Sequence, residues 1–186
     1  MKATQAKFLC LYFLLAFSCC KPEKFSVKKH QINLGHFLFF EKKLSVNRSK
    51  SCASCHSPQF AFTDGYRRSV SALGENLLHN APSLINLTGS SYFDWDNPGV
   101  QSLETQIKRP LYNKHPLEMG CNFSDAGLQK LFQGDSLYYA LFRLAYPDSD
   151  TTFTAGHIED CIIAYLKTLN FSNSRYDQYL AGEQSA

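Results

Sequence analysis

The chain has 186 residues, a formal net charge of +3, 44% hydrophobic residues and 14% aromatic residues. This length provides one domain with a sizeable hydrophobic core and leaves little room for a second. The small net charge, and the absence of a basic stripe interleaved with exposed aromatic residues, argue against nucleic-acid binding.

Residues 1–19 have the features of a secretory signal peptide. Two lysines precede an apolar run over residues 8–17, which is shorter than an ordinary membrane-spanning helix. Cys19 and Cys20 follow a small residue, as in the processing sites of bacterial lipoproteins, so we expect one of them to become a lipid-modified N-terminus. Ordinary cleavage is the alternative. We therefore expect an exported protein of the bacterial periplasm or cell envelope that touches a membrane only through a lipid anchor.

The remaining residues, 20–186, have the pattern of helices joined by long irregular segments, so we expect a mostly α domain. Dense apolar residues over 32–40 predict a buried first helix. Residues 57–99 contain many Gly and Pro residues and lack helical periodicity, which predicts ordered loops. Later helices are expected over residues 100–108, 124–132, 136–146 and 154–170, the last with Thr154 as its N-cap.

Between the first helix and the loops lies Cys52-Ala53-Ser54-Cys55-His56. This Cys-x-x-Cys-His spacing is the one that covalent attachment of c-type haem requires. The two thiols form thioethers with the haem, and the histidine ligates the iron. A thioredoxin-like redox pair needs a βαβ context that the sequence lacks, and a zinc site needs a second Cys/His pair.

Seven motifs follow one another along the chain: LGHFLFF (34–40), SCASCHSP (51–58), FTDG (62–65), NAPSLIN (80–86), DWDNP (94–98), PLEMG (116–120) and NSRYDQYLAG (173–182). In these motifs and their order, the chain resembles the bacterial di-haem cytochrome c peroxidases over residues 32–183. Within this superfamily it is most similar to the MauG-like and methanobactin-associated di-haem enzymes. The resemblance implies a cytochrome c-like haem domain, equivalent to the N-terminal, peroxidatic half of those proteins.

The resemblance implies roles for individual residues. Cys52 and Cys55 attach one haem c, and His56 is the proximal ligand of its iron. Glu118 matches the acid–base residue that moves protons during peroxide cleavage. Gln106 matches an amide that hydrogen-bonds the bound peroxide or water. Without the family context, Glu118 would be an ordinary surface glutamate and Gln106 an exposed helix residue.

Three further positions match the family pattern. Pro110 packs over the iron face, although on composition alone it is a helix terminator. Trp95 is the only tryptophan and matches an aromatic residue that relays electrons between the two haems, with core packing as the alternative. Asn80 matches one ligand of a calcium ion. Because calcium takes six or more oxygen ligands, we expect Ca²⁺ only in a complete two-domain form.

The sequence departs from the family pattern in two respects. No histidine lies where six-coordinate relatives place a displaceable distal ligand, and His79 is a poor substitute. We therefore expect a haem without a strong distal side-chain ligand. The family has a second domain with its own Cys-x-x-Cys-His motif, and this sequence holds one such motif, so we expect either a fragment of a two-haem protein or a truncated or split form.

These observations predict a peroxidase that reduces hydrogen peroxide to water with electrons from a donor cytochrome or cupredoxin. One alternative is a non-enzymatic electron carrier, and another is a MauG-like domain that oxidises a protein side chain. Cys121 and Cys161 remain once the signal and haem cysteines are assigned. A disulfide between them and burial as free thiols are both compatible with the sequence.

Overall fold

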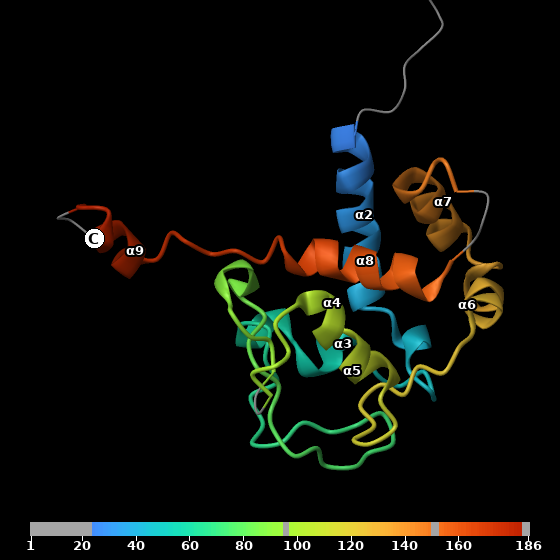
Figure 1. Cartoon of the computed structure of the whole chain (residues 1–186), viewed down its shortest axis with the longest axis horizontal. Helices are drawn as coiled ribbons and strands as arrows, with labels where there is room; N and C mark the ends of the chain where they lie inside the picture. Colours follow the sequence, from blue (N-terminus) through green and yellow to red (C-terminus); the bar gives the residue numbers. More distant parts are fainter. Residues whose placement is uncertain (1–23, 95–96, 150–152, 184–186) are drawn as a thin grey trace, which may run out of the picture.

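The computed structural model describes residues 24–94, 97–149 and 153–183, and this part of the chain is helical and contains no strand (Figure 1). The mostly α fold class expected from the sequence is confirmed. Short 3-10 helices are η1 (Lys42–Leu44), η2 (Pro58–Phe60) and η3 (Leu87–Gly89). The α-helices are α2 (Lys24–Phe39), α3 (Cys52–Cys55), α4 (Leu103–Gln106), α5 (Lys108–Tyr112), α6 (Asp125–Phe132), α7 (Ser136–Ala145), α8 (Ala155–Leu166) and α9 (Arg175–Leu180).

Helix α2 begins at Lys24, well before the predicted start at residue 32. Its first two turns contain lysines and few apolar residues, so no apolar stripe marks them in the sequence. Its last two turns bury Leu34, Leu38 and Phe39, as the dense apolar pattern predicted. The buried part of the helix was therefore predictable, and the solvated part was not.

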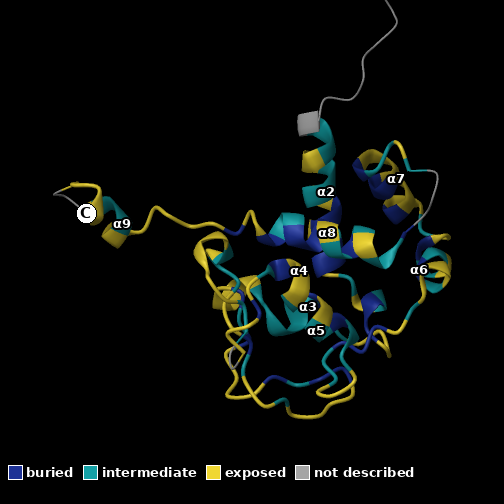
Figure 2. Cartoon of the chain, viewed as in Figure 1, coloured by how far each residue is buried: buried dark blue, intermediate teal, exposed yellow. Residues whose placement is uncertain are grey.

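Helices α2 and α8 cross and form the centre of the core (Figures 1 and 2). The crossing is close at Gly35, where an added Cβ would lie 1.8 Å from the carbonyl oxygen of Cys161. Thr154 caps α8 as predicted, since its hydroxyl accepts a hydrogen bond from the His157 amide at 3.2 Å. The helix ends at Leu166 and not at Asn170. Its C-cap is Lys167, and the chain forms a turn over residues 167–168.

The helix predicted over residues 100–108 is instead two short helices, α4 and α5, which meet at Ile107. Pro110 lies in the first turn of α5, where its missing N–H is tolerated. A single continuous helix from Leu103 to Tyr112 would place Pro110 in its interior, where the missing N–H would remove a backbone hydrogen bond. The proline therefore starts a new helix at this point.

Helices α6 and α7 lie within one residue of their predicted bounds because polar caps mark their starts. The Ser124 hydroxyl accepts from the Gly127 amide at 3.2 Å, and the Asp135 carboxylate accepts from the Leu137 amide at 3.2 Å. Helix α9 was not predicted. It is short and polar, and it projects away from the other helices at the end of an extended segment (Figure 1).

Residues 57–92 form ordered loops, as expected. Their order comes from side chains that bond to distant parts of the same segment. The Thr63 hydroxyl donates to the carbonyl of Ala81 at 2.6 Å, and the Ser69 hydroxyl donates to the buried Asp64 carboxylate at 2.5 Å. In a helix, backbone N–H and C=O groups bond to each other. In these loops, side chains provide some of the hydrogen-bond partners instead.

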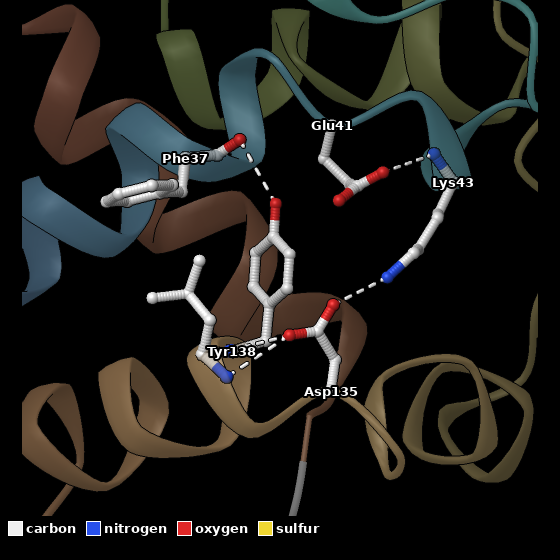
Figure 3. Close-up of polar contacts among 6 residues, drawn as sticks. Phe37, Glu41, Lys43, Asp135 and Tyr138 are labelled. Atoms are coloured by element: carbon white, nitrogen blue, oxygen red, sulfur yellow. Dashed lines mark hydrogen bonds and ion pairs between the residues drawn. The ribbon is translucent and has the colours of Figure 1, made fainter.

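The loop after α2 is joined to helix α7 by polar contacts (Figure 3). The Lys43 ammonium lies 2.7 Å from the Asp135 carboxylate, and the Tyr138 hydroxyl donates to the carbonyl of Phe37 at 3.3 Å. The ammonium also lies 5.5 Å from the centre of the Tyr138 ring. These contacts hold the end of α2 against the start of α7.

None of the helices in the described residues is long and apolar enough to cross a membrane. The predicted signal peptide, residues 1–19, and the candidate lipidation residues Cys19 and Cys20 lie outside the described residues.

Candidate haem site

A cavity of about 400 Å³ opens between the loops and the crossing of α2 and α8. Its apolar wall includes Phe39 of α2 and Leu103 of α4. Ile107, between α4 and α5, and Ile162 and Leu166 of α8 complete this wall. Apolar pockets of about 300–1,000 Å³ are of the size that holds cofactors and small ligands. The polar groups that line the same cavity include most of the residues singled out in the sequence.

Cys52 and Cys55 lie at the two ends of α3, and both line the cavity as free thiols. The short helix is capped by Ser54, whose hydroxyl accepts a hydrogen bond from the Ser51 amide at 3.0 Å. Burial raises the pKa of Cys52 to about 12, so its thiol is protonated at neutral pH. The two thiols are unpaired and therefore remain free to form thioethers.

His56 follows α3 and also lines the cavity. Its Nδ1–H donates a hydrogen bond to the carbonyl oxygen of Phe62 at 3.0 Å, which leaves Nε2 as the nitrogen that can ligate a metal ion. Burial lowers the pKa of the imidazole, so the neutral form that metals require is favoured. The Phe62 carbonyl thus fixes the orientation of the imidazole ring, as a histidine that ligates a metal ion requires.

The carbonyl of Phe62 reaches His56 because the intervening loop is tightly folded. Ala61 and Phe62 both adopt left-handed backbone conformations, with φ of 54° and 59°. The Phe62 amide donates to the Ser57 carbonyl at 2.8 Å, and the Ser57 amide donates to the Thr63 carbonyl at 3.1 Å. No sequence signal pointed to this acceptor, since a backbone carbonyl has no residue type of its own.

Glu118 lines the cavity on a segment that is held from two sides. The amide of Ala72 donates to the carbonyl of Glu118 at 2.8 Å, and the amide of Met119 donates to the carbonyl of Pro110 at 2.9 Å. Burial raises the pKa of the Glu118 carboxyl, and the positive charge of Arg109 partly opposes this. A carboxyl that faces a cavity in this way can both accept and donate a proton.

Gln106 and Pro110 line the same cavity from α4 and α5. The carboxamide oxygen of Gln106 is buried and has no hydrogen-bond partner. Because buried polar atoms almost always have a partner, this atom marks a place where a ligand or water would bind. The structure thus brings together Gln106, Pro110, Glu118 and the haem motif.

An ion pair that the sequence analysis missed also lines this cavity. Arg109 pairs with Asp94, and both side chains are partly buried. Each residue adjoins a position that the sequence did single out, since Asp94 precedes Trp95 and Arg109 precedes Pro110. A partly buried arginine beside Glu118 is the charge that limits the rise of its pKa.

His79 and Met119 both line the cavity wall. Met119 is only 6% exposed, and His79 lies on the loop that follows Leu78. Imidazole nitrogen and thioether sulfur are both able to ligate haem iron. The expectation of a haem without a strong distal side-chain ligand therefore stays a prediction.

Two predicted site residues are not placed in a functional geometry. Trp95 lies outside the described residues. Asn80 lines the cavity, but the described residues contain no cluster of three or more His, Cys, Asp or Glu side chains that could hold a metal ion. The calcium role of Asn80 stays a prediction.

Cys121 and Cys161 are both buried free thiols, so they are not joined in this structure. The Cys161 sulfur lies 3.4 Å from the Tyr146 hydroxyl. Burial raises the pKa of Cys161 to about 12, which keeps the thiol protonated. Of the two alternatives left open by the sequence, the structure has the free thiols.

Comparisons with known proteins show the family of the chain. The family model described as di-haem cytochrome c peroxidase matches residues 29–185. The methylamine utilization protein MauG of Methylorubrum extorquens is 30% identical over 165 residues, which cover 89% of this chain and 45% of that protein. The cytochrome c peroxidase Ccp of Escherichia coli is 29% identical over 165 residues, which cover 89% of this chain and 34% of that protein.

A solved structure of a MauG-like protein associated with microbial copper homeostasis is also similar, with a TM-score of 0.76 and 36% sequence identity. The match covers 83% of this chain and 44% of that one. The chain thus spans less than half the length of the relatives to which it is similar.

Proposed function

Because the chain belongs to the di-haem cytochrome c peroxidase family, we propose that it binds one haem c covalently and reduces hydrogen peroxide to water. Cys52 and Cys55 hold the haem through thioethers, and His56 ligates its iron through Nε2. Two unpaired thiols, an imidazole with Nδ1 already bonded and an apolar cavity wall all fit this group. When bound, the haem supplies the redox centre that exchanges electrons with peroxide.

The observation that carries this proposal is the presence of Glu118 and the unpaired Gln106 oxygen in the same cavity as the haem motif. Reduction of peroxide consumes two electrons and two protons and yields two waters. Glu118 takes the proton from one peroxide oxygen and returns it to the other, which leaves as water. Gln106 orients the peroxide or the product water by a hydrogen bond. Pro110 limits the volume of the cavity beside Gln106.

The test is the visible absorption spectrum of the haem-loaded chain in the ferric state, before and after one equivalent of hydrogen peroxide. We expect a high-spin spectrum that changes promptly. Glu118→Gln should slow the change by about 10²–10⁴-fold, the usual contribution of general acid–base catalysis. Glu104→Gln is the matched control, because Glu104 is exposed, pairs with Lys167 and does not line the haem cavity. Equal rates in both variants would contradict the role of Glu118.

A second candidate function is electron transfer without catalysis, in which the iron is ligated on both faces. The observation that favours it is that His79 and Met119 both line the cavity. This function predicts a low-spin ferric spectrum that peroxide leaves unchanged. Replacement of the ligating residue, by His79→Ala or Met119→Leu, should then convert the spectrum to high spin and identify the ligand.

Peroxide reduction also requires a source of electrons. A donor cytochrome or a cupredoxin is the simplest source, and Trp95 is the residue proposed to conduct the electrons. Similarity to a MauG-like protein adds a protein side chain as an alternative donor. Trp95→Phe should slow reduction by an external donor while leaving the first reaction with peroxide unchanged, and stopped-flow absorbance separates the two steps.

We also propose export through residues 1–19, with lipid attachment at Cys19 or Cys20 in place of ordinary cleavage. The intact mass of the chain recovered from the bacterial cell envelope distinguishes the two processing routes. Ca²⁺ binding is proposed only for a form that carries a second haem domain, because Asn80 by itself provides a single amide oxygen.

A further inference from the structure

We propose that Tyr165 is a redox-active residue that passes an electron from the protein surface to the haem along the proximal side of the cavity. The proposal rests on the proposed peroxidase function. Its basis in the structure is a row of aromatic side chains, Phe62, Phe39, Tyr165 and His36, which we call the proximal path. This path begins at the histidine that ligates the iron and does not involve Trp95.

The inner part of the proximal path starts at His56. Its Nδ1–H bonds to the Phe62 carbonyl at 3.0 Å, and the Phe62 ring lies 6.1 Å from the Phe39 ring between centroids. The Phe39 ring lies 5.3 Å from the ring of Tyr165. Phe39 also lines the cavity directly and is only 1% exposed, so the path passes through the core beside the haem.

The outer part of the path reaches solvent. The Tyr165 ring lies 5.2 Å from the ring of His36, with the two planes at 75°. The His36 ring lies 5.2 Å from the ring of Phe40, which is 41% exposed. His36 is itself exposed, while Tyr165 is partly buried. These ring distances lie within the range of favourable aromatic pairs.

The two helices that carry the path are held rigidly together. Phe39 and His36 belong to α2, and Tyr165 belongs to α8 (Figure 1). The helices cross at Gly35, where an added Cβ would lie 3.0 Å from the Cβ of Tyr165. The close crossing therefore fixes Tyr165 against the aromatic end of α2, and a fixed separation is what electron transfer between rings requires.

The residues of the proximal path differ in how easily they are oxidised. Phenylalanine rings resist oxidation, so Phe39 and Phe62 only bridge the distance. Tyr165 is the member that can be oxidised. It loses one electron to the haem that one peroxide has oxidised, and its phenolic proton passes to water. Burial raises the pKa of its hydroxyl, so the phenol is protonated before it reacts. A one-electron donor at the His36 and Phe40 surface then supplies the electron, and water returns the proton, which together restore the tyrosine.

The chain contains a matched control at Tyr146. Its ring is also partly buried and lies 4.1 Å from a histidine, His157, and 5.2 Å from Phe142. This second ring cluster continues to Phe153 and Phe132. In the described part of the chain, this cluster makes no ring contact with Phe39, Phe62 or Tyr165, so it should not carry electrons from the haem.

The test uses the haem-loaded chain mixed with hydrogen peroxide in the absence of a reductant and frozen at short times. Electron paramagnetic resonance should show a tyrosyl radical, which incorporation of ring-deuterated tyrosine identifies by a narrower signal. We expect the signal to be lost in Tyr165→Phe and kept in Tyr146→Phe. Phe39→Leu, which interrupts the path, should delay the radical without removing it. The ferric spectrum before peroxide should be the same in the unmodified chain, Tyr165→Phe and Tyr146→Phe.

Three results would overturn the proposal while leaving the peroxidase function intact. One is a haem spectrum that peroxide changes without any tyrosyl signal in the unmodified chain. The others are a tyrosyl signal of equal strength in Tyr165→Phe and one lost equally in Tyr146→Phe. A haem spectrum that does not respond to peroxide would instead overturn the proposed function, and this proposal with it.

Discussion

Glu118 is subject to two opposing electrostatic influences, and their balance sets the pH range in which it can act. Burial raises the pKa of its carboxyl above the usual 4.5, and Arg109 limits the rise. Because the carboxylate form accepts the peroxide proton, the rate of reaction with peroxide should rise with pH through this elevated pKa. The rate measured by stopped-flow absorbance over acidic to neutral pH should show this rise, and Glu118→Gln should abolish it.

The ion pair beside Glu118 allows the same pKa to be shifted in both directions. Arg109→Gln removes the positive charge, so the pKa of Glu118 should rise and the pH profile should move to higher pH. Asp94→Asn removes the negative charge that offsets Arg109, so the profile should move to lower pH. Shifts of the same sign in both variants would contradict direct electrostatic control of Glu118.

For individual residues, the sequence predicted which side chains line the cavity better than it predicted the contacts that alter their orientation or pKa. The cavity contains Glu118, Gln106 and Pro110 together with the haem motif, as the family resemblance implied. The carbonyl that orients His56 was not predictable, because any residue at position 62 would carry one. The ion pair of Arg109 with Asp94 was missed because it depends on a contact between segments that the sequence does not mark.

Among the elements, the crossing of α2 and α8 should be the most sensitive to a small change. In Gly35→Ala the new Cβ would lie 1.8 Å from the Cys161 carbonyl oxygen, so the helices must move apart. We expect the free energy of unfolding to fall by about 3 kcal/mol, the upper end for overpacked cores, because the obstacle is backbone.

The control for this prediction is Gly134→Ala, because an added Cβ at Gly134 meets nothing within 4 Å. Its effect should stay within about 0.5 kcal/mol, as for ordinary surface substitutions. Chemical denaturation of both haem-loaded variants provides the comparison. Equal stabilities would show that the crossing tolerates a wider separation than the structure indicates.

Helix bounds were predictable where a polar cap marks the start. Ser124 and Thr154 both cap their helices through the side chain, and the observed starts agree with the predicted ones. Helix α5, which continues beyond the predicted end at residue 108, was missed because Pro110 in the sequence predicts the end of a helix, whereas here it lies in a first turn. The start of α2 was missed because its solvated turns carry no apolar periodicity.

Across the whole molecule, Lys43 and Asp135 connect segments that are 92 residues apart in the sequence. Their side chains are 34% and 29% exposed, so the pair is partly screened by solvent. A double-mutant cycle with Lys43→Met and Asp135→Asn should give a coupling energy of at most about 1 kcal/mol, which salt reduces. Zero coupling at low salt would contradict a stabilising contact.

The pH dependence of this coupling has a definite sign. The hydrogen bond from Lys43 lowers the pKa of Asp135 below its usual 3.8. A lowered carboxyl pKa stabilises the folded state at pH values above the unfolded pKa, and this stabilisation is lost as pH falls through the lowered value. The measured coupling should therefore be constant near neutral pH and disappear only in strong acid.

The sequence by itself determined the haem-attachment motif, the family resemblance and the mostly α fold class, because these depend on local spacing and on the order of motifs along the chain. Only the tertiary structure decided which groups meet. It placed the Phe62 carbonyl on His56, the Arg109 charge near Glu118 and the Phe39 ring between the cavity and Tyr165. Such contacts depend on how distant segments pack, and a spacing rule along the chain carries no information about them.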